Sequence, residues 1–181
     1  SVTPLQLARA YAAIGNGGRL HTATFVKGGG DEGEQVIDPA IARQLMTMME
    51  TVTGPEGTAR RAAVLGYRVA GKTGTSRKAS GGGYAAKRYA AVFVGLVPAT
   101  NPRFAMAVVV HDPQGLEYGG GAVAAPVFHR VMEGALRLMD VPPDDMPAWY
   151  AAQAKRAPTT AAVVPVPPMA LPTATPAVAP A

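Results

Sequence analysis

The 181-residue chain has no cysteine, only 6% aromatic residues and only 16% charged residues. The lack of cysteine excludes disulfide bonds and thiolate metal sites, although it does not identify a compartment. No apolar run is long enough to cross a bilayer. The chain begins at Ser1 without an initiator methionine or an apolar leader. We therefore expect the natural protein to begin upstream of residue 1.

Histidine and clustered charge are also scarce. The three histidines, His21, His111 and His129, share no metal-ligand spacing, so we expect neither a metal site nor a cofactor. The net charge is +5, but the basic residues are scattered except at 76–88, "SRKASGGGYAAKR". No aromatic-rich motif for reading RNA accompanies them. Dispersed solvated charge is the simplest interpretation, and no nucleic-acid partner is expected.

The first third of the chain carries two helix signatures, each with a capping residue followed by proline. Thr3 and Pro4 begin the first helix, and Gln6 completes a capping-box spacing. Residues 19–27 then suit a strand or an extended arm. Asp38 and Pro39 begin the second helix. Its apolar periodicity predicts a buried face made of Ile41, Leu45, Met48, Met49 and Val52.

Three β-like segments follow a short helical stretch within 53–62, and the short connections between these segments predict an antiparallel meander. The segments are 67–75, 89–98 and 103–113. A last helix is predicted from about Pro126. The sequence thus indicates an α/β fold of the α+β type, an antiparallel sheet flanked by helices, over residues 1–145. Residues 146–181 are rich in Pro and Ala, and we expect them to form a mobile tail.

The stretch "GYRVAGKTGTS" at 66–76 satisfies two incompatible patterns. Gly66 to Thr73 matches the phosphate-binding P-loop, G-x-x-x-x-G-K-[ST]. A working P-loop needs a strand before it and a helix starting at Lys72-Thr73, yet Gly74 and the nearby glycines oppose a helix there. Tyr67, Arg68 and Val69 favour extended backbone. The context therefore favours the second pattern, a K-T-G box on an exposed strand.

A K-T-G box on an exposed strand suits the binding of an anionic peptide. A substrate peptide can pair with the strand as an added neighbour. Gly74 allows another backbone to approach closely. Lys72 supplies a fixed positive charge, and the Thr73 and Thr75 hydroxyls can donate to a carboxylate, each such bond contributing roughly 1.5–3 kcal/mol.

Several longer stretches then resemble one family in its order and spacing, the class B penicillin-binding proteins. The resemblance covers nearly all of residues 1–144 and is greatest to the septal, division-specific transpeptidases of Gram-negative bacteria. It is carried by "SVTPLQLARAYAAIGNGG", "TGPEGTA", "VAGKTGTSRK", "PRFAMAVVVHDP", "YGGGAVAAPVF" and "ALRLMDVPPD". It implies the transpeptidase fold shared with serine β-lactamases, here incomplete at its N-terminus.

The resemblance implies a D,D-transpeptidase that cross-links peptidoglycan stem peptides ending in D-Ala-D-Ala and is acylated by β-lactams. Of the family's three boxes, S-x-x-K, S-x-N and K-T-G, only the last is present. The only serines, Ser1, Ser76 and Ser80, head neither missing box. We therefore expect the nucleophile upstream of residue 1 and the fragment to be inactive alone. A membrane anchor, a periplasmic catalytic domain and partners in the division machinery are implied as well.

The same resemblance assigns roles within the motif. Lys72 lends charge beside the nucleophile, and the Thr75 backbone N–H forms half of the oxyanion hole. Thr73 and Thr75 hold the substrate carboxylate, while Gly74 leaves room for its backbone. Arg77 and the loop at Tyr118, Gly119 and Gly120 resemble the rim of the site, although a solvated arginine and a plain turn explain them equally well.

Two further residues receive structural explanations from the sequence. A helix start explains Thr58 without catalysis. Asp112 is expected to end a strand rather than to act as a base. Two alternative functions remain open beside the transpeptidase: a P-loop nucleotidase, and a penicillin-recognising sensor or non-catalytic interaction domain on the same fold.

Overall fold

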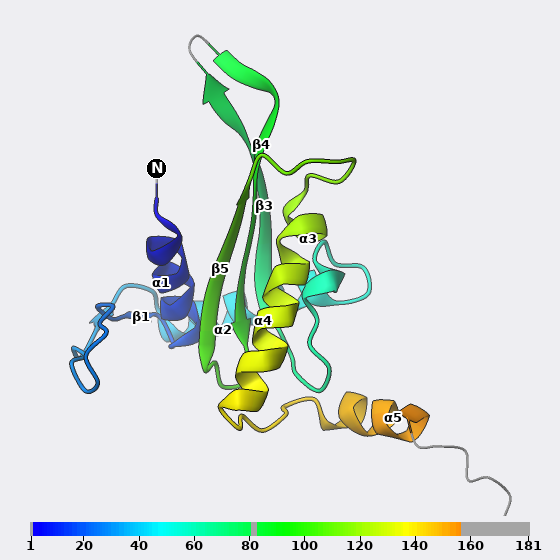
Figure 1. The fold of residues 1–181 in the computed structure, drawn as a ribbon. Coiled ribbons are helices and arrows are strands. Elements are labelled where there is room, and N and C mark those ends of the chain that lie inside the picture. The colour runs from blue at the N-terminus through cyan, green and yellow to red at the C-terminus, as the bar shows by residue number, and fades with distance from the viewer. Residues whose placement is uncertain (1, 81–82, 157–181) are drawn as a thin grey trace, which may run out of the picture.

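The structure is a computed structural model that describes residues 2–80 and 83–156 (Figure 1). In these residues no helix combines the length and the apolar character needed to cross a membrane. The helices are α1 (Pro4–Gly15), α2 (Pro39–Glu50), α3 (Gly120–Val123), α4 (Ala125–Leu138), α5 (Met146–Arg156) and the 3-10 turns η1 (Thr51–Thr53) and η2 (Arg60–Ala62). The strands are β1 (Arg19–Leu20), β2 (Glu34–Gln35), β3 (Ala70–Ser80), β4 (Gly83–Val97) and β5 (Phe104–His111).

The predicted meander is confirmed: β3, β4 and β5 form an antiparallel sheet in that order. The hairpin between β3 and β4 is longer than the sequence suggests, because strand pairing continues as far as Ser80 and Gly83. A register shift between Arg77 and Ala79 interrupts this extension. Since β4 lies in the middle, the outer edge of β3 has no strand partner among the described residues.

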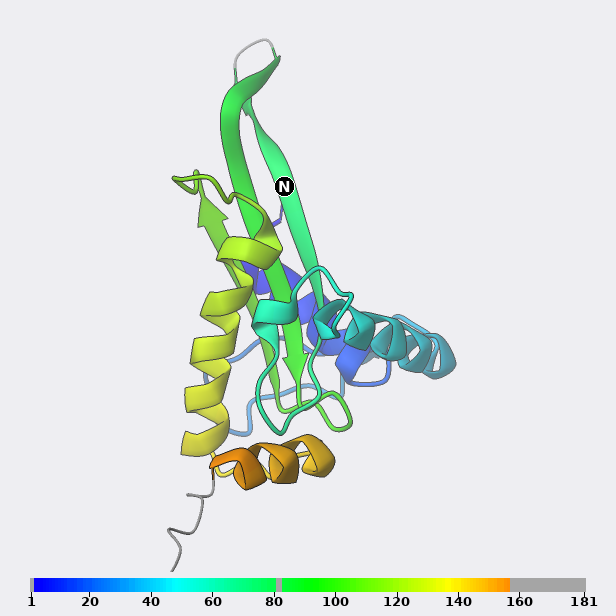
Figure 2. The same cartoon turned by 90° about the vertical axis from the view of Figure 1, so that its right-hand side faces the viewer.

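Helices cover the sheet on both faces (Figure 2). On one face α4 packs on β4 and β5 through an apolar cluster that includes Phe93, Phe128 and Leu136. The rings of Phe93 and Phe128 meet edge to face with centroids 5.0 Å apart, a favoured aromatic geometry. On the other face α1 and α2 contribute Tyr11, Ile14, Met46 and Met49 to a smaller cluster with Leu96. The α+β fold class is confirmed.

The helix starts agree with the sequence, but the predicted burial of the second helix is partly wrong. The Thr3 hydroxyl accepts from the Gln6 N–H, and Asp38 caps α2. Within α2, only Ala42 and Met49 are buried. Ile41 is exposed, and Met48 is 62% exposed. Periodicity correctly identified an apolar face of α2. In the described structure, however, other elements cover only the part of that face around Met49.

The extended arm predicted at 19–27 contains only the two residues of β1, which pair with β2. The tail predicted from residue 146 also needs correction, because its first eleven residues form α5. The Asp145 carboxylate accepts from the Ala148 N–H, and the Asp145 N–H donates to the Gly66 carbonyl. Trp149 packs so closely on Gly66 that a Cβ there would lie 2.7 Å from the ring. Composition alone gave no sign of this anchoring; residues 157–181 lie outside the described part.

Candidate active site

The K-T-G residues occupy the edge strand β3 and point alternately to its two sides. Thr73 and Thr75 lie opposite Phe93 and Ala91, on the side covered by α3 and α4. Lys72 lies opposite Val94, on the side of α1. Because successive side chains of a strand face opposite ways, a ligand along this edge meets the ammonium from one side and the two hydroxyls from the other.

Lys72 borders an open hollow of about 380 Å³ between β3 and α1. Leu7 and Tyr11 of α1 form its apolar wall, and Gly74 and Val92 form part of its floor. The Lys72 ammonium donates to the Thr73 carbonyl at 2.8 Å. Within residues 2–80 and 83–156, no carboxylate lies in ion-pairing range of it. This cation is therefore available to an anionic ligand.

The Thr75 hydroxyl is held by the start of α3. It accepts the Gly120 N–H at 3.1 Å, so its own O–H remains free to donate outward. Gly120 is buried, and a Cβ there would lie 2.1 Å from the Val92 carbonyl oxygen. Only glycine fits so close to the sheet. Gly119 lies beside the same hydroxyl, with a would-be Cβ 3.9 Å away.

Thr58 contacts the site, which the sequence interpretation missed. Its hydroxyl lies 3.0 Å from the Thr73 hydroxyl, so each K-T-G threonine has a partner from outside the strand. The helix-start explanation is wrong, because η2 begins at Arg60 and has no side-chain cap. The one sequence signal for a role of Thr58 was that the stretch "TGPEGTA" resembles the family. The spacing of fifteen residues between Thr58 and Thr73 gives no indication that the two side chains meet.

The predicted rim residues lie next to one another at the far end of the K-T-G motif. Tyr118 stacks on Tyr89 with ring centroids 4.3 Å apart. Tyr89 is the cross-strand partner of Arg77, whose exposed side chain shares the side of Thr75. The geometry brings Arg77, Tyr118 and Gly119 to one end of the threonine pair.

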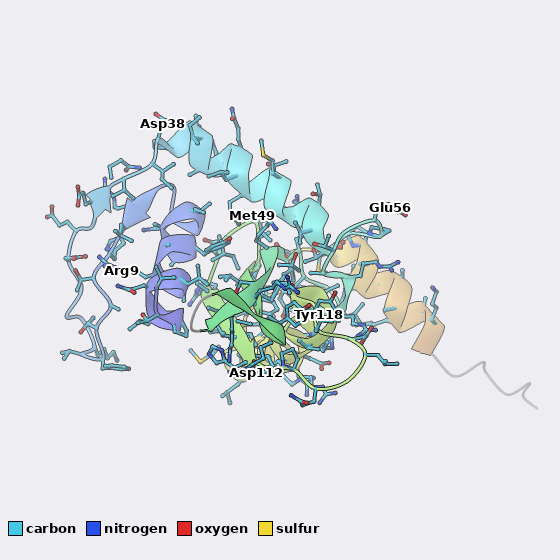
Figure 3. The ribbon with its side chains drawn as sticks, turned by 90° about the horizontal axis from the view of Figure 1, so that it is seen from above. Arg9, Asp38, Met49, Glu56, Asp112 and Tyr118 are labelled. Atoms are coloured by element: carbon cyan, nitrogen blue, oxygen red, sulfur yellow. The ribbon has the colours of Figure 1, made fainter. Side chains whose placement is uncertain are left out.

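Asp112 ends β5, as the sequence predicts, and it also fastens the extended hairpin. Its carboxylate accepts from Arg88 at 2.8 Å and from Lys78 at 2.7 Å. The Arg88 guanidinium, followed by the Lys78 ammonium, lowers the pKa of Asp112 to about 2. So acidic a carboxylate is a poor base. Figure 3 shows Asp112 on the side of the sheet away from α2, with Tyr118 beside the strands.

The competing site types fit this geometry poorly. The P-loop interpretation is wrong, because Lys72 and Thr73 lie inside a strand rather than at the start of a helix. In the described part of the chain, no group of three His, Asp or Glu side chains could hold a metal ion. His21 contacts Asp31, and His129 contacts the Ala63 carbonyl, so neither of these contacts involves the motif.

Comparison with known proteins agrees with this geometry. Residues 1–133 match the family described as "Penicillin binding protein transpeptidase domain". The chain is 46% identical over 144 residues to peptidoglycan D,D-transpeptidase FtsI of Escherichia coli K12, covering 79% of this chain and 24% of that protein. It is 43% identical over 148 residues to the probable peptidoglycan D,D-transpeptidase PbpC of Pseudomonas aeruginosa, covering 81% and 26%.

Among solved structures, the apo transpeptidase domain of Burkholderia pseudomallei penicillin-binding protein 3 is similar, with a TM-score of 0.72 and 43% identity. That match covers 79% of this chain and 44% of the solved chain. The chain thus spans about a quarter of the length of its full-length relatives. The predicted family resemblance is confirmed. By the matched family, the sequence identity and the shared fold, this chain belongs to the penicillin-binding protein transpeptidases.

Proposed function

We propose that this chain is the K-T-G-bearing part of a serine D,D-transpeptidase that cross-links peptidoglycan stem peptides during septal wall synthesis. The observation that carries the proposal is the edge strand β3, which presents Lys72, Thr73 and Thr75 without a strand partner in the described residues. An extended peptide ending in a carboxylate suits such an edge. Membership of the transpeptidase family supports the same chemistry.

In the proposed reaction, a serine hydroxyl from outside this chain adds to the carbonyl carbon of the penultimate D-Ala. The bond to the terminal D-Ala then breaks, and D-Ala leaves with the proton. The amine of a neighbouring stem peptide next takes the acyl group and frees the serine. A β-lactam enters the same first step, but its opened ring stays attached.

We assign the roles of this chain by position. Lys72 lends positive charge where the carboxylate and the oxyanion gather, and the Thr75 N–H donates to the oxyanion. The Thr73 and Thr75 hydroxyls donate to the terminal carboxylate, and Gly74 admits the peptide backbone. Arg77, Tyr118 and Gly119 border the bound peptide. Fixed donors act most strongly where water is excluded.

The wider setting of the proposal comes from the relatives. We propose that the full-length protein is anchored in the bacterial inner membrane with this domain in the periplasm. We further propose that its other partners belong to the division machinery and contact parts of the protein outside this chain. The match to a transpeptidase named FtsI supports the septal assignment.

Labelling with a fluorescent penicillin tests the proposal. The full-length protein should give a labelled band on a denaturing gel that disappears with excess unlabelled drug. The 181-residue chain should give none, because none of its serines heads an S-x-x-K box. A competed band from the short chain would defeat the fragment assignment, and an unlabelled full-length protein would defeat the enzyme.

A further inference from the structure

We propose that Arg61 and Glu117 are positioning residues that hold the two K-T-G threonine hydroxyls in register. This inference rests on the proposed function, since it concerns how that site is set. Neither side chain contacts the K-T-G residues in the structure. Both act through the loops that do.

The two threonine hydroxyls are held from two separate loops. Thr58, which contacts the Thr73 hydroxyl, belongs to the turn between η1 and η2. Gly120, which donates to the Thr75 hydroxyl, begins α3 at the end of the loop after β5. The relative placement of the two hydroxyls therefore depends on how these loops sit against each other.

Arg61 ties the two loops together. Its guanidinium donates to both carboxylate oxygens of Glu117, at 2.7 and 3.1 Å, and also to the Ala122 carbonyl at 3.1 Å. The hydrogen bond from Arg61 lowers the pKa of Glu117, so the pair is ionised at neutral pH. Ala122 lies in α3 beside Gly120, and Arg61 lies three residues after Thr58. One side chain thus fixes both loops.

The contact between the loops is also too close for side chains. A Cβ on Gly121 would lie 1.9 Å from the Thr58 carbonyl oxygen. A loop pressed this closely on its neighbour cannot shift without moving the group that it presents to the K-T-G threonines, the Thr58 hydroxyl in one case and the Gly120 N–H in the other. We name the contacts of Arg61 with Glu117 and Ala122 the Arg61 clamp.

The clamp differs from an ordinary surface ion pair in its fork geometry. The Arg61 and Glu117 side chains are 54% and 58% exposed, so the pair should contribute little to global stability. A bidentate arginine nevertheless fixes direction, which lysine cannot do. Displacement of a positioning group by about 1 Å can slow a reaction as much as a hundredfold. Loss of the Arg61 clamp should loosen the two loops only partly, so we expect acylation to slow about tenfold.

The test uses the full-length enzyme with Arg61→Lys, Glu117→Gln and the double variant. The measurements are the acylation rate constant for penicillin, resolved into binding and acylation steps, and the melting temperature. The acylation rate constant should fall about tenfold in each single variant. It should fall no further in the double variant, because all three variants break the same interaction. The melting temperature should shift by less than about 2 °C.

The control pair is Arg137 and Glu133 on the exposed side of α4, which lie 3.6 Å apart. Arg137→Lys and Glu133→Gln should be acylated at the wild-type rate. The clamp is overturned if the Arg61 and Glu117 variants keep the wild-type rate, or if the control variants lose as much.

Hydrogen exchange separates the clamp from the proposed function. Arg61→Lys should speed exchange in the peptide containing Gly120, whether or not the enzyme reacts with penicillin, and Arg137→Lys should not. If wild-type enzyme is never acylated, the proposed function is wrong and exchange alone decides the clamp. Unchanged exchange in Arg61→Lys would overturn it.

Discussion

The two faces of the central sheet are built for different tasks. On the α4 face, Phe93, Phe128 and Leu136 are almost completely enclosed. On the α1 and α2 face the cluster around Leu96 is smaller, and an open hollow reaches Lys72. Packing density stabilises a fold, whereas a reactive cation must remain reachable. The comparison indicates that stability comes mainly from the first face, and it is consistent with our proposal that the Lys72 ammonium acts from the second.

The largest expected effect is on the closed face. Phe128→Ala removes a ring that has no exposed surface and meets Phe93 edge to face. The free energy of unfolding should fall by about 3–5 kcal/mol, because the cavity cannot fill. Urea unfolding monitored by circular dichroism measures this. A loss below about 1 kcal/mol would contradict the assignment of stability to this face.

On the open face, Lys72→Ala in the full-length enzyme should slow acylation by penicillin at least about a hundredfold, comparable to the loss of an oxyanion donor. The ammonium is exposed and bonds only the neighbouring Thr73 carbonyl in the described structure, so the melting temperature should barely change. Rapid-mixing kinetics give the rate. Wild-type acylation by a folded variant would refute the K-T-G assignment.

Thr75 lies on the edge strand β3 with its side chain on the α3 and α4 side, and its substitution should have an intermediate effect. Thr75→Val removes the hydroxyl that we propose donates to the substrate carboxylate, and it leaves the Gly120 N–H without its acceptor. We expect drug binding about tenfold weaker, with a smaller change in the acylation step. Thr75→Ser keeps the hydroxyl and serves as the matched control. A loss in Thr75→Ser as large as that in Thr75→Val would show that removal of the hydroxyl does not account for the effect.

Met48 provides the matched substitution on the helix of the open face. Its side chain is 62% exposed, so Met48→Ala should change the unfolding free energy of the 181-residue chain by no more than about 0.5 kcal/mol. The same urea experiment as for Phe128 measures it. A loss as large as that of Phe128→Ala would remove the contrast between the faces.

The smallest effect should come from Asp112 and depends on pH. Its pKa falls from 3.8 to about 2 through Arg88 and Lys78, so its stabilising contribution is present above pH 4 and lost as the pH falls toward 2. Asp112→Asn should lower the melting temperature slightly at pH 7, and the difference from wild type should shrink at pH 2.5. A difference at pH 2.5 as large as that at pH 7 would exclude the charge as its source.

Features that depend on neighbours in the chain could be predicted from the sequence alone. Thr3 and Asp38 predicted the starts of α1 and α2, because an N-cap acts within one turn of the helix. Short connections and alternating apolar residues predicted the meander, and the K-T-G motif within longer matching stretches indicated the family. The placement of Lys72 and Thr75 on an edge strand followed from the same local pattern.

Which distant groups meet depends instead on the tertiary packing. Thr58 reaches Thr73 across fifteen residues, and Arg61 reaches Glu117 across fifty-six. No periodicity or capping rule reports such a pairing, because it depends on how whole elements pack. Packing also left Met48 exposed and anchored α5 on Gly66. Local chemistry set the elements and their motif, and long-range packing set the geometry in which the motif can act.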